Sequence, residues 1–214
     1  MMSQLRLETE RYLGRRFMDI RPERSLNVGA GKEKHRRWIP SGAKVVNLDR
    51  QAFSGIDVVH DFNSGLPFPD RDFDLVILSN VLEHAPNPFH LMAESARVLA
   101  PDGQIIGVVP FLTGLHQEPY DFYRFTRYGI ERLLSSAEFE VLDITPLGRL
   151  TDVYLGAQGT IFWELVKDGS LRWRAIWKAQ RAFNRLFGLK SERGAVGAFC
   201  EGFGFSARKP AKRP

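Results

Sequence analysis

The chain has 214 residues, of which 43% are apolar and 26% are charged, with a formal net charge of +5 and a single cysteine, Cys200. This composition is that of a folded globular protein, and one cysteine excludes both an intrachain disulfide and a zinc cage built from cysteines. No apolar run approaches the roughly 18 to 20 residues that span a bilayer, and the N-terminus lacks the apolar middle of a secretory signal, so we expect a cytoplasmic protein.

Short β-like runs alternate with loops or helical patterns from residue 25 onward, as they do in doubly wound α/β proteins. Turn residues at Pro101, Asp102 and Gly103 are expected to end the first predicted helix of this region. The predicted strands are 25–28, 44–48, 56–59, 73–78, 104–109, 139–144 and 202–207, and the predicted helices are 88–99 and 127–137. The sequence therefore predicts one α/β core.

The predicted organisation places a helical segment at 1–24, the core at 25–148, a helical insertion at 149–198, the last strand of the core at 199–209 and a tail at 210–214. The insertion separates apolar from basic side chains at the helical period. The apolar arc is Trp173, Ile176, Trp177, Phe183 and Phe187, and the basic arc is Arg174, Lys178, Arg181 and Arg185. The apolar arc either packs on the sheet or on a second subunit, or lies on an anionic membrane at its inner face through 173–187.

The run LNVGAG, residues 26–31, feeds the first predicted strand into a Gly-x-Gly turn at Gly29 and Gly31. Glycines at such a turn let the backbone approach a nucleotide closely, which suggests an adenosine cofactor. Position 34 is Lys, where the dinucleotide fingerprint needs a small residue, and no Gly-Lys-Ser/Thr follows at the spacing of a P-loop. The remaining interpretation is an adenosine-type ligand without a pyrophosphate.

Two acidic residues follow the second and third predicted strands. Asp49 stands where a carboxylate accepts hydrogen bonds from both ribose hydroxyls, the alternative being a turn or cap aspartate. Asp61 is placed to take the adenine amino group while Phe62 flanks the base, the alternative being a simple loop Asp. Both strand ends therefore point to the same nucleoside.

The segments LNVGAG, VVNLDR, HDFNSGLPFPDRDFDLVILSNVLEH and ARVLAPDGQIIGVVP, in this order and spacing, resemble the class I S-adenosylmethionine-dependent methyltransferases of the small-molecule type. The resemblance covers about residues 25–148, and GFGFSARK looks like the seventh strand of the family. It implies a Rossmann-like seven-stranded methyltransferase sheet flanked by helices, with a C-terminal amphipathic helical insertion before the last strand. It also implies S-adenosyl-L-methionine as cofactor, bound by Asn27, Gly29, Ala30, Gly31, Asp49, Arg50, Asp61, Phe62, Ser79 and Asn80.

The sequence departs from the family pattern at three points. Asn27 stands where the family usually has Asp or Glu, which removes a charge that would attract the cofactor's ammonium group. Glu33 replaces a common third glycine. Because only about thirteen residues separate Gly31 from the second strand, the helix after the turn is expected to be very short.

The acceptor side of the resemblance points to small molecules. The amino-group methyltransferases that act on DNA bases carry an Asn/Asp-Pro-Pro-aromatic motif where this chain has SNVLEH, so we do not expect a nucleic acid acceptor. The segment GLHQEPYDFYRFT resembles an H-x-x-P-x-D-aromatic-aromatic-R-F-T pattern of a subgroup associated with bacterial cell-surface polysaccharides. The predicted catalytic residues are His116 and Asp121, the predicted substrate-binding residues are His84, Tyr120, Tyr123 and Arg124, and no metal-ligand set is predicted.

The predicted function is S-adenosylmethionine-dependent methyl transfer to a small-molecule or glycan-linked acceptor at a hydroxyl oxygen. Asp121 and Arg124 have an alternative role, in which they pair with each other and brace the loop. Asn27 and Glu33 motivate an alternative function as a noncatalytic cofactor-binding partner protein. The net charge and the KPAKRP tail motivate a third, an RNA methyltransferase. The sequence leaves the oligomeric state open.

Overall fold

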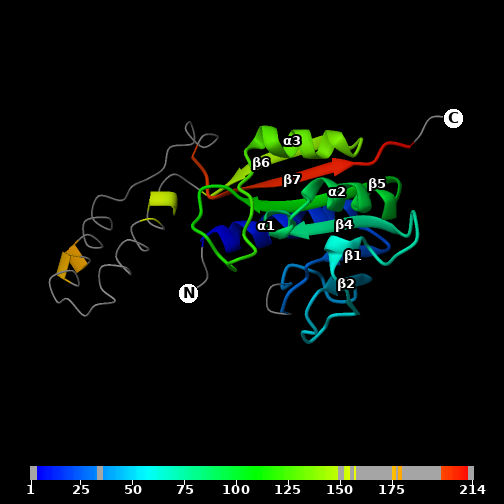
Figure 1. The fold of residues 1–214 in the computed structure, drawn as a ribbon, viewed down its shortest axis with the longest axis horizontal. Coiled ribbons are helices and arrows are strands. Elements are labelled where there is room, and N and C mark those ends of the chain that lie inside the picture. Colours follow the sequence, from blue (N-terminus) through cyan, green and yellow to red (C-terminus); the bar gives the residue numbers. More distant parts are fainter. Residues whose placement is uncertain are drawn as a thin grey trace.

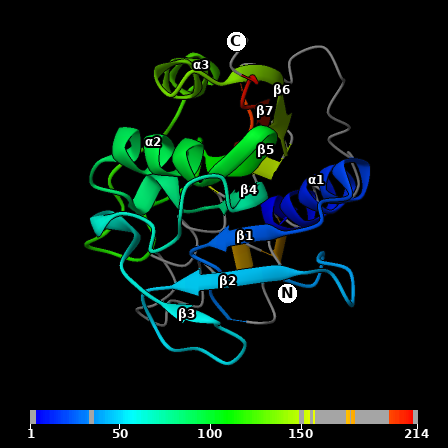
Figure 2. The ribbon, with the colours of Figure 1, turned by 90° about the vertical axis from the view of Figure 1, so that its right-hand side faces the viewer.

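The computed structural model describes residues 4–32, 36–148, 152–154, 157, 175–176, 178–179 and 199–211. Within this part of the chain, seven strands form one sheet in the order β3-β2-β1-β4-β5-β7-β6, with helices on both faces (Figures 1 and 2). The strands are β1 Ser25–Val28, β2 Val45–Asp49, β3 Val58–Val59, β4 Phe73–Ser79, β5 Leu99–Pro110, β6 Glu140–Leu147 and β7 Gly202–Arg208. The helices are α1 Gln4–Ile20, α2 Pro88–Val98 and α3 Arg127–Ser136, with short 3-10 turns η2 Phe62–Ser64 and η3 Leu82–His84.

The first five strands run parallel, and β7 is antiparallel to both of its neighbours, β5 and β6. The parallel strands are covered on both faces, which is why β4 reads as a nearly continuous apolar run, FDLVILS. This mixed seven-stranded sheet confirms the predicted fold class, and it brings the carboxyl ends of β1, β2, β4 and β5 to one edge.

The two faces of the sheet carry separate apolar cores. Alternation along β4 sends Leu75 and Ile77 toward α1, where they pack with Leu13, and sends Val76 and Leu78 into the larger core. Figure 2 shows α1 on one side of the sheet and α2 and α3 on the other. The β4 strand is therefore fixed from both sides immediately before the residues predicted to face the cofactor.

Two side-chain caps set where helices begin. The side chain of Asn87 accepts the backbone N–H of His90 at the start of α2, and that of Thr126 accepts the N–H of Gly129 at the start of α3. The second cap ends the segment between β5 and α3, residues 111–126, which we call the β5–α3 loop. This loop carries the predicted catalytic residues, so its end points are fixed by β5 and by the Thr126 cap.

The structure differs from the sequence-based expectation at one connection. The turn residues Pro101 to Gly103 lie inside β5 rather than after α2, because Asp102 adopts a φ of 62° and donates its N–H to the Lys209 carbonyl at 2.9 Å.

The very short helix expected after the glycine turn stays a prediction, because residues 33–35 lie outside the described part of the chain. The described residues between Gly31 and β2 include turns, and Trp38 packs edge-on against Phe17 with ring centroids 6.1 Å apart.

Most of the predicted amphipathic insertion lies outside the described residues, and its membrane or packing role stays a prediction. Of the two arcs, only Ile176 and Lys178 are described, and both are exposed. A search of the described helices for one long and apolar enough to cross a bilayer finds none.

Glu201 stands at the start of β7 in a partly buried position. Its Oε2 atom is buried without a hydrogen-bond partner among the described residues, and a Cβ placed on Gly148 would lie 2.7 Å from it. Burial, together with the charges of Asp152 and Glu8, raises the pKa of Glu201 to about 7. The ionised form is therefore disfavoured in the folded protein.

Because the folded pKa lies above the unfolded one, Glu201 contributes stability that is present below about pH 4.5 and is lost as pH rises through about 7. We predict that Glu201→Gln leaves the free energy of unfolding nearly unchanged at acidic pH and raises it at pH 8 by on the order of 1–2 kcal/mol, a figure reduced for the partial exposure. Urea unfolding across this range measures the difference, with the exposed Glu138→Gln as control. A Glu201→Gln stability profile parallel to that of the wild type would contradict the prediction.

Candidate active site

A cleft of about 650 Å³ opens at the carboxyl ends of β1, β2, β4 and β5. Its size is that of an ordinary small-molecule site. The predicted site residues that line it are Asn27, Gly29, Ala30, Gly31, Asp49, Arg50, Phe62, Ser79, Asn80, His84 and His116. The predicted residues that do not line it are Asp61, Tyr120, Asp121, Tyr123 and Arg124.

The turn after β1 presents bare backbone to the cleft. Gly29 and Gly31 both have a φ of 62°, a left-handed conformation that side chains rarely adopt. A Cβ on Gly29 would lie 2.6 Å from Cγ2 of Val81, so any larger residue would displace the start of the segment after β4. The backbone here is shaped to be approached closely by a ligand.

Asp49 ties this turn to the end of β2. Its Oδ2 accepts the Gly31 N–H and its Oδ1 accepts the Gln51 N–H, each at 2.9 Å. The residue is only 8% exposed, yet it lines the cleft. Because each carboxylate oxygen has two lone pairs, both oxygens keep acceptor capacity for the hydroxyls of a ligand.

Asn27 is buried beneath the turn and lines the cleft. Its Nδ2 donates to Oδ1 of Asn47 at 3.1 Å, and Asn47 in turn donates its backbone N–H to Asp57 at 2.7 Å. With its amide nitrogen engaged in this way, the side-chain oxygen of Asn27 is the atom it offers to a ligand amine. A hydrogen bond from a ligand amine to this oxygen would involve no negative charge, because Asn27 replaces the Asp or Glu of the family pattern.

The residues after β3 are divided between the cleft and the surface. Phe62 is buried and lines the cleft, whereas Asp61 is exposed and its Oδ1 accepts the Asn63 N–H at 3.0 Å as the cap of η2. This capping bond corresponds to the alternative role of Asp61, that of a simple loop aspartate. Its contact with adenine stays a prediction.

The β5–α3 loop is braced by Asp121 and Arg124. The guanidinium of Arg124 grips both carboxylate oxygens of Asp121, at 2.6 and 2.7 Å, and also donates to the Gly114 carbonyl at 2.9 Å. The Asp121 side chain is 1% exposed and accepts the His116 N–H at 2.9 Å. The Arg124 guanidinium holds the pKa of Asp121 well below its usual range. This geometry favours the bracing role over substrate contact or catalysis for both residues.

The two tyrosines of the loop do not line the cleft and instead contact neighbouring segments. Arg50, which lines the cleft, places its guanidinium 4.7 Å from the Tyr120 ring centroid. The Tyr123 hydroxyl donates to the Pro86 carbonyl at 3.0 Å, which joins the loop to the segment before α2. Both rings remain partly exposed.

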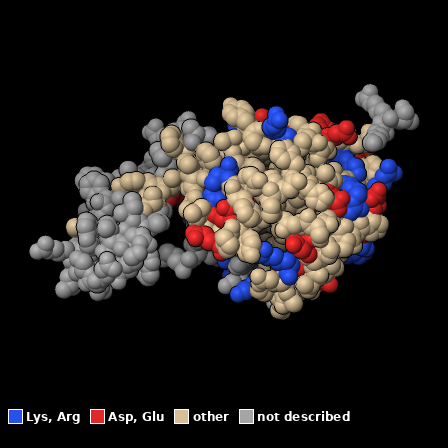
Figure 3. Space-filling view, viewed as in Figure 1, with Lys and Arg blue, Asp and Glu red and all other residues tan. Residues whose placement is uncertain are grey.

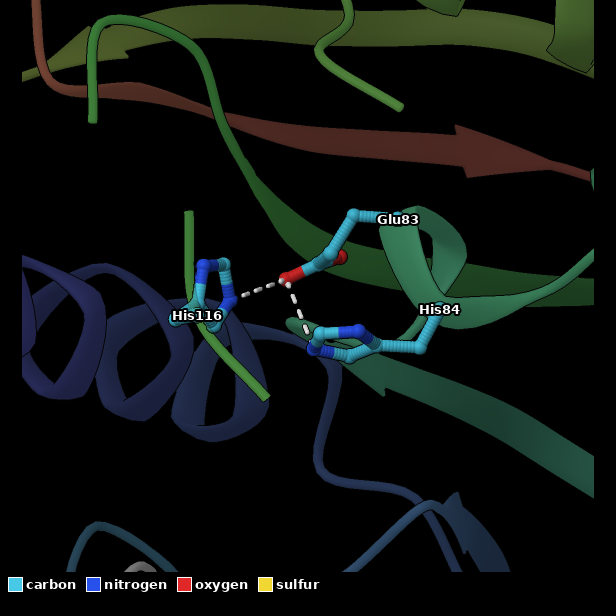
Figure 4. A group of neighbouring side chains, drawn as sticks. All are labelled: Glu83, His84 and His116. Atoms are coloured by element: carbon cyan, nitrogen blue, oxygen red, sulfur yellow. Dashed lines mark ion pairs between the residues drawn. The ribbon is translucent and has the colours of Figure 1, made fainter. Parts of the chain in front are cut away.

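One residue absent from the sequence-based site, Glu83, lies between the two predicted histidines (Figure 4). Its Oε1 is 3.8 Å from Nε2 of His84 and 3.7 Å from Nε2 of His116. Glu83 raises the pKa of His116, burial opposes this shift, and Asp121 adds to it.

The sequence offered one signal for Glu83, because this acidic residue stands within the otherwise apolar VLEH run, where a buried side chain is expected. The possible ligand atoms of the three residues lie within 4.8 Å of one another, which departs from the expectation of no metal-ligand set.

Comparisons with known proteins agree with this geometry. Residues 26–107 match the family model described as a methyltransferase domain. An uncharacterized protein of Methanocaldococcus jannaschii is 30% identical over 154 residues, covering 67% of this chain and 71% of that one. Demethylmenaquinone methyltransferase of Bacillus licheniformis is 32% identical over 78 residues, covering 35% of this chain and 34% of that one, so the match spans about a third of that enzyme.

The fold also matches solved methyltransferases. The 1,6-didemethyltoxoflavin-N1-methyltransferase of Burkholderia thailandensis, solved with its substrate and S-adenosylhomocysteine, has a TM-score of 0.60 at 16% identity, covering 94% of this chain and 78% of that one. The cleft, the glycine cradle that a Cβ would fill, and Asp49 all fit S-adenosylmethionine, which is the cofactor. Residues 26–107 of the chain therefore carry a methyltransferase domain, on the fold of the class I S-adenosylmethionine-dependent methyltransferases.

Proposed function

We propose that this protein transfers a methyl group to a hydroxyl oxygen of a small-molecule or glycan-linked acceptor. The observation that carries the proposal is the composition of one cleft. The glycine turn, Asp49, His84 and His116 all line it. A cofactor site and a pair of proton-handling side chains therefore share one cavity.

When bound, S-adenosylmethionine supplies a sulfonium methyl group, whose carbon–sulfur bond breaks with its electron pair left on sulfur as the acceptor oxygen bonds to the methyl carbon and loses its proton. The task of the protein is to hold the two reactants aligned and close. The backbone of Gly29 to Gly31 and the carboxylate of Asp49 hold the cofactor side. An imidazole at the acceptor side binds a hydroxyl or takes up its proton.

The charge pattern on one face of the molecule favours a small or sugar-containing acceptor over a nucleic acid. Figure 3 shows Lys and Arg interspersed with Asp and Glu on one face of the described chain, whereas a nucleic-acid-binding face gathers basic residues. Tyr120 and Tyr123 are partly exposed, and the Tyr120 ring packs under Arg50, which lines the cleft. Aromatic rings in this position suit stacking on a sugar, which supports a role in polysaccharide biosynthesis.

We predict that Gly29→Ala weakens binding of S-adenosylhomocysteine at least about tenfold, because the new methyl group meets Val81 at 2.6 Å and the residue keeps a φ of 62°. Gly42→Ala is the matched control, since Gly42 also has a positive φ of 84° but nothing lies within 4 Å of the added Cβ. Titration calorimetry measures both. Equal affinities for the two variants would remove the glycine turn from the cofactor site.

We predict that His116→Ala lowers kcat by about a hundredfold or more while the affinity for S-adenosylhomocysteine changes little, because His116 faces the acceptor and not the cofactor cradle. The exposed His90→Ala, on α2, serves as control. Methylated product is followed by mass spectrometry with a pool of hydroxyl-bearing acceptors. Binding of the cofactor product without turnover on any acceptor would contradict the proposed activity, and an unchanged kcat in His116→Ala would exclude His116 from it.

A further inference from the structure

We propose that Glu83, His84 and His116 form a binding site for one divalent transition-metal cation, such as Zn²⁺, at the acceptor side of the cleft. Three ligand atoms converge there from two elements, η3 after β4 and the β5–α3 loop (Figure 4). Two features of these residues favour a cation: the nitrogen of each imidazole that carries its proton, and the surroundings of Glu83.

The tautomer of His84 follows from its neighbour. Its Nδ1 is 2.6 Å from the carbonyl oxygen of Tyr120, which only accepts hydrogen bonds, so Nδ1 carries the proton. In the neutral ring, Nε2 then holds a lone pair. This atom is buried without a hydrogen-bond partner among the described residues, and it faces Oε1 of Glu83 at 3.8 Å.

His116 is oriented in the same way. Its Nδ1 lies 3.3 Å from Oδ2 of Asp121 and 3.4 Å from the Gly114 carbonyl, both acceptors. Arg124 also approaches Nδ1 at 3.4 Å, but its N–H groups are directed to Asp121 and Gly114 at shorter distances. In the neutral ring the proton therefore stays on Nδ1, and the lone pair of Nε2 faces Oε1 of Glu83 at 3.7 Å. Because Glu83 raises the pKa of His116, a metal ion would compete with a second proton for this lone pair.

Glu83 is the residue that demands a positive charge. It is fully buried, and neither carboxylate oxygen has a hydrogen-bond partner among the described residues. A buried carboxylate without such partners is costly. Distances of 3.7 and 3.8 Å to the two Nε2 atoms are too long for hydrogen bonds. Two lone pairs and an anion directed at one point are what a cation would satisfy.

The spacing and the ligand types fit a transition metal. Zn²⁺ binds His nitrogen and carboxylate oxygen at about 2.0–2.2 Å, which places two ligands of a tetrahedral ion about 3.4 Å apart. The two carboxylate–imidazole separations of 3.7 and 3.8 Å lie close to this value, and all three ligand atoms lie within 4.8 Å of one another, so the side chains must move inward to bind an ion. Two imidazoles and one carboxylate suit Zn²⁺ and its neighbours, whereas Mg²⁺ and Ca²⁺ prefer oxygen ligands alone.

The surrounding groups are those that support a metal site. Each Nδ1–H is held by an acceptor, the Tyr120 carbonyl for His84 and the Asp121 carboxylate for His116, which fixes the ring with Nε2 pointing at Glu83. Three protein ligands leave a fourth position open, as in catalytic zinc sites. Because both histidines line the cleft, this position faces the space where the acceptor is expected.

The catalytic use of this site rests on the proposed function. A cation there would bind the acceptor hydroxyl as a Lewis acid and lower the pKa of its proton. In the metal-bound form His116 would act as a metal ligand, and water rather than the imidazole would take up that proton. A cation at this site would therefore favour a hydroxyl group as the methyl acceptor. Metal binding itself is independent of the acceptor and is tested without turnover.

The test uses the full-length chain without a histidine tag, stripped with chelator and titrated with Co²⁺, whose visible absorption reports four-coordinate nitrogen and oxygen ligation. We expect one Co²⁺ per chain, displaced by one Zn²⁺. Glu83→Gln and His116→Ala should each weaken Zn²⁺ binding on the order of a hundredfold or more, since groups that only orient a metal ligand already contribute about 10- to 100-fold. His90→Ala should bind as the wild type does.

Calorimetry with S-adenosylhomocysteine on each metal-free variant shows that the fold is retained and separates the two proposals. Absence of a Co²⁺ spectrum in a wild-type chain that binds S-adenosylhomocysteine would overturn the metal site and leave the proposed function standing. A spectrum unchanged by Glu83→Gln and His116→Ala would place the metal elsewhere and also overturn it. Metal binding without methyl transfer to any hydroxyl acceptor would count against the proposed function alone.

Discussion

The carboxylate of Asp49 holds together the part of the molecule on which cofactor binding depends. By accepting the N–H groups of Gly31 and Gln51 at 2.9 Å, it joins the turn after β1 to the chain after β2. The parallel register of β1 and β2, with Val28 opposite Leu48, brings these groups together. The left-handed turn of Gly29 and Gly31 is therefore held by Asp49 before any ligand binds. The same side chain fixes the cradle and offers acceptors to the ligand.

The opposite side of the cleft is organised by a second carboxylate that never enters it. Asp121 binds Arg124 through both oxygens and takes the backbone N–H of His116, which fixes the β5–α3 loop over the end of β4. His84 reaches the same point from η3 and bonds the loop backbone at Tyr120. Both halves of the site thus rely on buried charges bonded to backbone, and Glu83, which has no such bonds among the described residues, is the exception that calls for a ligand.

The sequence predicts the sheet because apolar runs, turn residues and the spacing of the glycine turn all reflect local physics. It also predicts that Asp49 lies at the cleft, because the end of a parallel strand must reach the ligand edge. It does not separate alternatives that depend on contacts across the loop. Asp121 is paired with Arg124 and Asp61 caps a turn, since short-range donors lay within reach of both carboxylates. Glu83 was missed because its importance comes from His116, which lies in a different part of the chain and meets it only in the folded sheet.

We expect Asp49 and the glycine turn to hold S-adenosylmethionine with its reactive end directed at the two histidines. A crystal structure of the full chain with S-adenosylhomocysteine would show this arrangement. In it the ribose hydroxyls should lie within hydrogen-bond distance of the Asp49 carboxylate, and the sulfur should lie on the side of the cleft lined by His84 and His116. A ligand bound outside this cleft, or one whose ribose leaves Asp49 uncontacted, would contradict it.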